Sequence, residues 1–124
     1  MSCFWDSILK KLNKNDLQKY KIHNNQELVT YLKNNNCSTD NVLCNNQKLS
    51  EKQKVENKEH IQCYQTNTIS QGYLCSTCDP FLLLLCEIFE ITIHNNYNGN
   101  NIIYSHQTTN KYTIQLNNNS SHMS

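Results

Sequence analysis

The chain has 124 residues and a formal net charge of +1 at pH 7, with 37% hydrophobic and 17% charged residues. This length fits one domain, residues 1–124, with a single modest core. The lysines are scattered, and no apolar run approaches the roughly 18–20 residues that span a bilayer. The sequence therefore favours neither a nucleic-acid partner nor a membrane anchor.

Cysteine and asparagine usage gives two further expectations. The seven cysteines are an odd number, and no secretory signal precedes them, so we expect reduced thiols in the cytoplasm. Two glycines and one proline leave few residues for tight turns. We therefore expect the abundant asparagines to occupy those positions.

The first third of the chain predicts two helices. Apolar residues with helical spacing follow Cys3 and predict a helix with one buried face, formed by Phe4, Trp5, Ile8, Leu9 and Leu12. Residues 14–25 are polar and predict a loop with a short turn. Residues 26–33 predict a second helix that buries Leu28, Val29 and Leu32, with Asn24 or Asn25 as its cap.

The middle of the chain has the weakest core signal. Residues 34–47 predict a loop rich in Asn, Ser and Asp. Ser50 and Gln53 resemble a capping box, which predicts a polar helix running toward His60. We expect residues 34–60 to be exposed.

The last third predicts a buried helix and a small sheet. Asp79 and Pro80 are typical of a helix start, and the apolar residues 81–89 that follow predict a central, buried helix. Residues 91–94, 102–105 and 111–116 predict strands, with a turn at 95–101. Tyr112, Ile114 and Leu116 alternate onto one face. The predicted fold class is α+β, with helices packed on a short, largely antiparallel sheet.

Cys3 is a candidate nucleophile because it lies in the first turn of a predicted helix. A helix N-terminus favours negative charge and can lower the pKa of a thiol. A thiol nucleophile also needs a base, usually histidine. His122 follows the last predicted strand in a loop, where a scaffold can present a side chain. The other four histidines, His23, His60, His94 and His106, are expected at the surface.

Metal binding is the main alternative from the residues alone. Cys75 and Cys78 form a C-x-x-C pair, which Cys37, Cys44, Cys63 or Cys86 could complete to a tetrahedral zinc site. No second pair with matching spacing accompanies it. Cys86 lies within the apolar helix and is expected to be a core residue.

The order of three short motifs resembles the ovarian-tumour (OTU) family of papain-like cysteine proteases, particularly its small viral members. The nucleophile motif is Cys3-Phe4-Trp5-Asp6-Ser7-Ile8, and the second block is Gly72-Tyr73 followed by the apolar helix and a strand. The third block is Ile114-Gln115-Leu116, a short loop and His122-Met123. Together these blocks cover nearly the whole chain.

The resemblance implies a small papain-like domain acting as a monomeric deubiquitinase without a cofactor or metal. Its partner would be ubiquitin or a ubiquitin-like modifier, in the host cytoplasm if the protein is viral. Cys3 would be the nucleophile and His122 the base, with the backbone N–H groups of Ser2 and Cys3 forming the oxyanion hole. Cleavage of a viral polyprotein is a further activity that the resemblance suggests.

The departures from the family pattern leave a second interpretation open. The family's Asp-Gly-Asn-type loop has no counterpart in the two residues before Cys3, and Met123 replaces an aromatic residue. The third catalytic residue is unassigned, with Ser124 and the asparagines of 117–119 as candidates. These features favour the alternative, a catalytically incompetent OTU-like interaction module.

Overall fold

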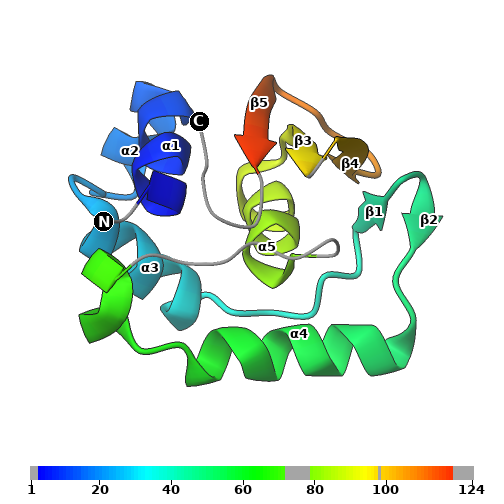
Figure 1. Ribbon diagram of the computed structural model, residues 1–124, viewed down its shortest axis with the longest axis horizontal. Coiled ribbons are helices and arrows are strands. Elements are labelled where there is room, and N and C mark those ends of the chain that lie inside the picture. The colour runs from blue at the N-terminus through cyan, green and yellow to red at the C-terminus, as the bar shows by residue number, and fades with distance from the viewer. Residues whose placement is uncertain (1–2, 72–78, 98, 119–124) are drawn as a thin grey trace.

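The computed structural model describes residues 3–71, 79–97 and 99–118 of the chain (Figure 1). The helices are α1 (Cys3–Lys11), α2 (Lys14–Lys19), α3 (Asn25–Asn34), α4 (Glu51–Cys63), the 3-10 helix η1 (Thr66–Gln71) and α5 (Pro80–Phe89). The strands are β1 (Val42–Cys44), β2 (Gln47–Lys48), β3 (Thr92–Tyr97), β4 (Asn100–His106) and β5 (Thr113–Asn118).

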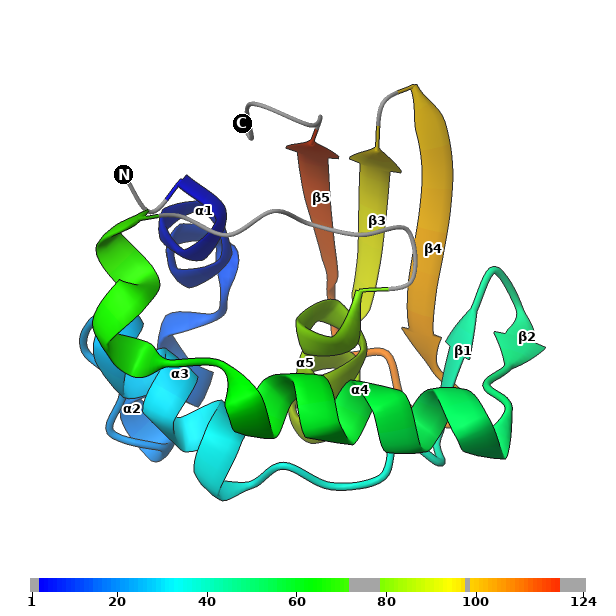
Figure 2. The ribbon, with the colours of Figure 1, turned by 60° about the horizontal axis from the view of Figure 1, so that its bottom comes forward.

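The five strands form one sheet in the order β2-β1-β4-β3-β5. Every neighbouring pair is antiparallel except β3 and β5, which run parallel (Figure 2). The predicted α+β class with a largely antiparallel sheet is therefore confirmed. The parallel pair arises because β4 returns beside one edge of β3, and the chain then crosses to the other edge of β3 to form β5.

Helix α5 is central and buried, as predicted. The Asp79 carboxylate accepts hydrogen bonds from the N–H groups of Phe81 (3.0 Å) and Leu82 (3.2 Å). This caps two of the donors that a helix start leaves unpaired. The helix packs on the sheet through β1, β3 and β4, and on α3 and α4. Contacts on both sides explain why its apolar residues run nearly all round the helix.

The two predicted N-terminal helices are confirmed, and the polar segment between them contains a third. Phe4, Trp5, Ile8 and Leu12 are buried, and α3 buries Leu28, Val29 and Leu32 behind an Asn24 cap. The prediction of a loop at residues 14–25 was wrong in part, because α2 forms there. This short helix is capped by Asn13 and buries no residue, so it carries no hydrophobic periodicity that a sequence pattern could detect.

The predicted loop at residues 34–47 was also wrong in part, because it contains the hairpin of β1 and β2. Asn45 and Asn46 connect these strands with φ angles of 51° and 64°, as a two-residue hairpin turn of type I′ requires. This confirms that asparagine occupies special turn positions. The capping-box prediction is confirmed too, since the Ser50 hydroxyl accepts from the Gln53 N–H at 3.1 Å and α4 follows.

The three predicted strands of the last third are confirmed: β3 and β4 are longer than predicted, and β5 has the predicted length but lies two residues further along the chain. Ile114 and Leu116 are buried and Tyr112 is half-buried on the predicted face. The turn between β3 and β4 is shorter than predicted and includes Gly99, whose φ of 85° suits glycine.

Candidate active site

Helix α1 begins at Cys3, and its next residues are fixed in the core. The Trp5 side chain is fully buried, with its indole N–H donating to the Tyr64 hydroxyl at 3.1 Å. Its ring packs edge-on against Phe81 near the start of α5, with centroids 4.9 Å apart. The predicted helix start at the candidate nucleophile is therefore confirmed, and α1 is rigidly held close to it.

Three polar contacts join the end of α1 and the start of α2 to β5. The Lys11 ammonium donates to the Gln115 carbonyl at 2.7 Å. The Tyr112 hydroxyl accepts from the Asn13 N–H at 2.9 Å and donates to a carboxylate oxygen of Asp16 at 3.1 Å. Burial raises the pKa of Tyr112 to about 12, so the phenol keeps the proton that it donates.

The order of these contacts shows that α1 and β5 run in opposite directions. Asn13 contacts Tyr112, and Lys11, which is earlier in the sequence, contacts Gln115, which is later. From that contact, α1 extends about 12 Å to Cys3, and β5 about 10 Å to Asn118. The start of α1 and the end of β5 therefore lie at the same end of the molecule (Figure 2).

The remaining predicted site residues, Ser2 and His122, lie outside the described residues. So do Gly72 and Tyr73 of the second motif, and Cys75 and Cys78 of the alternative zinc site. Among the described residues, no group of three or more His, Cys, Asp or Glu side chains is arranged to hold a metal ion.

The described histidines differ from one another in burial. His23 and His60 are exposed, as expected, and His23 contacts Glu27 at 3.0 Å. His94 is half-buried and lies within β3 rather than at the end of a strand. The expectation that His106 is solvated was wrong. It is the last residue of β4, and only 7% of its side chain is exposed.

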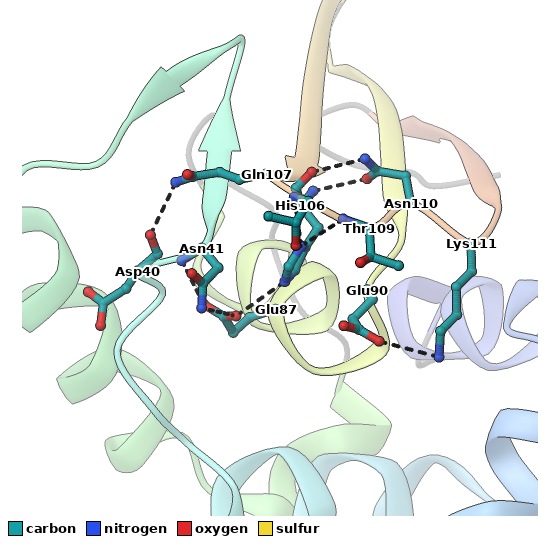
Figure 3. Close-up of polar contacts among 10 residues, drawn as sticks. Asp40, Asn41, Glu87, Glu90, His106, Gln107, Thr109, Asn110 and Lys111 are labelled. Carbon is teal, nitrogen blue, oxygen red and sulfur yellow. Dashed lines mark hydrogen bonds and ion pairs between the residues drawn. The ribbon is translucent and has the colours of Figure 1, made fainter.

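The buried His106 side chain faces Glu87, which lies inside α5 (Figure 3). The imidazole Nε2 lies 3.6 Å from Glu87 Oε2. On the other side of the carboxylate, Asn41 donates from its backbone N–H at 3.0 Å and from its side chain at 3.1 Å. Glu87 thus has partners from both β4 and the segment before β1, which satisfies a carboxylate that is only 10% exposed.

The other ring nitrogen of His106 fixes the orientation of the imidazole. His106 Nδ1 accepts the N–H groups of Thr108 and Thr109, both at 3.2 Å. An acceptor at Nδ1 assigns the hydrogen of the neutral ring to Nε2, which faces Glu87. Asn110 closes the same turn, donating to the His106 carbonyl at 2.9 Å and accepting its N–H at 3.0 Å. This arrangement joins three segments of the chain.

One signal in the sequence could have identified this buried pair. Glu87 is the only charged residue in the apolar stretch 81–89, and a carboxylate in a buried helix needs a partner. The pattern shows that a partner exists but not which residue supplies it, because the partners lie 19 and 46 positions away in the chain.

The described cysteines divide into buried and accessible thiols. Cys86 is fully buried, its thiol donates to the Tyr104 carbonyl at 3.6 Å, and burial raises its pKa. This confirms it as a core residue and makes it a poor nucleophile. Cys37 and Cys63 are exposed, while Cys44 is half-buried.

Comparison of the chain with protein-family models, with curated proteins and with solved structures gives no match. Within the described parts of the chain, no helix combines the length and apolar character needed to cross a membrane.

Proposed function

We propose that this protein is a cysteine isopeptidase of the OTU type, which cleaves the bond after the C-terminal glycine of ubiquitin or a ubiquitin-like modifier. The observation that carries the proposal is the antiparallel arrangement of α1 and β5. It brings the helix start that holds Cys3 to the end of the strand that leads to His122.

The length of chain between β5 and the proposed base is compatible with this pairing. His122 follows Asn118 by four residues, which can extend at most about 14 Å. Cys3 and His122 are 119 positions apart in the sequence, so the proposed chemistry requires a rigid connection between α1 and β5. The Tyr112 contacts with Asn13 and Asp16 provide that connection.

The proposed reaction has two steps. His122 takes the Cys3 proton, the thiolate attacks the glycine carbonyl, and the backbone N–H groups of Ser2 and Cys3 stabilise the oxyanion. The C–N bond then breaks as His122 gives its proton to the leaving lysine amine, which leaves a thioester. A water, deprotonated by His122, hydrolyses the thioester and restores the thiol. A thiol nucleophile must stay reduced, which fits a cytoplasmic location.

A ubiquitin carrying a C-terminal electrophile, such as a vinyl methyl ester, tests the proposal. We expect a covalent adduct on Cys3, detected by intact mass and peptide mapping, and its loss in Cys3→Ala and His122→Ala. Cys37→Ala and Cys63→Ala are matched controls, because these exposed thiols would react only without specificity.

The outcome separates the enzyme from the two alternative functions. The absence of an adduct on Cys3 in a folded protein would overturn the proposed enzymatic function. Binding of ubiquitin without an adduct would then support the interaction module. If no adduct forms and metal analysis under reducing conditions finds one zinc per chain, the result would instead support the metal-binding adaptor.

A further inference from the structure

We propose that Tyr112 is a positioning residue for this site, because its hydroxyl fixes the register of α1 against β5 and thereby the approach of Cys3 to His122. This inference rests on the proposed function and deepens it, since it names the residue on which the alignment of nucleophile and base depends.

The Tyr112 hydroxyl is held on the sheet side by the backbone that carries it. Tyr112 directly precedes β5, and its carbonyl accepts the Thr92 N–H of β3 at 3.1 Å. Its side chain is half-buried and packs against the core. A tyrosine ring has only two rotatable bonds, so the hydroxyl lies at a fixed place relative to the parallel strands.

The same hydroxyl holds the helical side at two points. It accepts the N–H of Asn13, the N-cap of α2, and donates to Asp16 within α2. The Leu12 N–H bonds to the Ile8 carbonyl at 3.0 Å, so helical bonding extends from α1 almost to Asn13. A displacement at Asn13 is therefore transmitted along a stiff helix to Cys3.

Lys11 cannot set the register in the same way. Its contact with the Gln115 carbonyl comes from an exposed ammonium on a flexible stem of four carbons. The stem can follow a sliding helix and keep its hydrogen bond. Tyr112, which both donates and accepts, loses its two bonds if either side moves.

The variant Tyr112→Phe removes both hydrogen bonds and keeps the ring. We expect the rate of adduct formation with the ubiquitin electrophile to fall by about 10- to 100-fold, the loss that a misplacement of about 1 Å produces. Tyr20→Phe is the matched control. Tyr20 is also half-buried and packs on Tyr31 and Phe89, but its hydroxyl has no hydrogen bond among the described residues.

The pH dependence of Cys3 alkylation distinguishes positioning from a purely structural role. Wild-type Cys3, paired with His122, should react with iodoacetamide at a pH well below the ordinary thiol pKa of about 8.5. In Tyr112→Phe, the alkylation midpoint should move toward that ordinary value. An unchanged midpoint and adduct rate, with only a lower melting temperature, would overturn the inference.

Asp16 provides a second route should Tyr112→Phe fail to fold. Asp16→Asn keeps an acceptor for the hydroxyl and should react like the wild type, whereas Asp16→Ala should show a smaller form of the Tyr112→Phe defect. Equal rates of adduct formation for both variants and the wild type would contradict this inference but leave the proposed function intact. A wild-type protein without any adduct would remove the proposed function and this inference together.

Discussion

Glu87 and His106 face each other across the junction of α5 and β4, with the carboxylate oxygen 3.6 Å from Nε2 of the imidazole. Because both side chains are buried, each depends on the other and on the backbone donors around them. The pair is therefore sensitive to the loss of either partner.

Replacing Glu87 tests the contribution of this pair to stability. We expect Glu87→Ala to lower the free energy of unfolding by about 2–3 kcal/mol, because the two Asn41 donors lose their acceptor and the imidazole loses the carboxylate that lies 3.6 Å from it. Urea titration measures the change. Glu56→Ala is the control, since its ion pair with Lys52 is exposed and contributes less than about 0.5 kcal/mol. Equal losses in the two variants would contradict the prediction.

The raised pKa of Tyr112 predicts a loss of stability in alkali. Burial favours the protonated phenol, whose pKa rises from 10.0 to about 12 in the folded chain. A group whose pKa is higher in the folded state stabilises fully below its unfolded pKa, and less as the pH rises toward its folded pKa. The stability advantage of wild type over Tyr112→Phe should therefore be constant below pH 10 and shrink between pH 10 and 12.

Measurement of the free energy of unfolding at several pH values, for both proteins in parallel, checks this prediction. The comparison cancels other alkaline effects, including titration of the buried Cys86 thiol. A difference between the two proteins that stays constant up to pH 12 would be inconsistent with the bonded phenol described above.

The cap of α5 should contribute more to stability than an exposed cap. Asp79→Ala leaves two buried N–H groups without their acceptor, so we expect a loss of about 2 kcal/mol, the upper end of the range for N-caps. Ser50→Ala, at the exposed start of α4, should cost about 1 kcal/mol or less. Thermal and urea unfolding of both variants give the comparison, and a larger loss in Ser50→Ala would refute the ranking.

Thiol labelling should follow the burial of the cysteines. In the native protein, iodoacetamide should modify Cys63 within a short pulse and Cys37 more slowly, because burial raises the pKa of the Cys37 thiol, whereas Cys86 should react only after denaturation. Peptide mapping by mass spectrometry resolves the sites. Rapid native labelling of Cys86 would mean that α5 opens far more readily than its packing implies.

The helices and strands with a clear hydrophobic pattern in the sequence were predicted well. The apolar run 81–89 after Asp79 and Pro80 predicted a central helix, and the alternation through Ile114 and Leu116 predicted a half-buried strand; both are confirmed. In contrast, α2 and β1 are short and are stabilised by tertiary contacts rather than by their own periodicity. In β1 only Val42 is fully buried, which leaves too little signal in three residues.

The candidate site was predictable to a smaller extent. The sequence predicts the helix start at Cys3, and the structure confirms it. The contacts of Tyr112 with Asn13 and Asp16 join residues 99 and 96 positions apart, and polar residues at such distances show no pattern that links them. His106 has polar neighbours in the sequence, and only the fold brings Glu87 to it. The roles of Cys3 and His122 stay predictions.

The contacts of α1 have a consequence for the order in which the protein is made. Trp5 packs on Tyr64 and Phe81, and Lys11 bonds to Gln115, so every one of these partners is synthesised after the helix itself. Helix α1 therefore leaves the ribosome early but completes its docking only when β5 has been made. The helix that carries the proposed nucleophile therefore cannot dock on β5 while only the residues before Thr113 have been made.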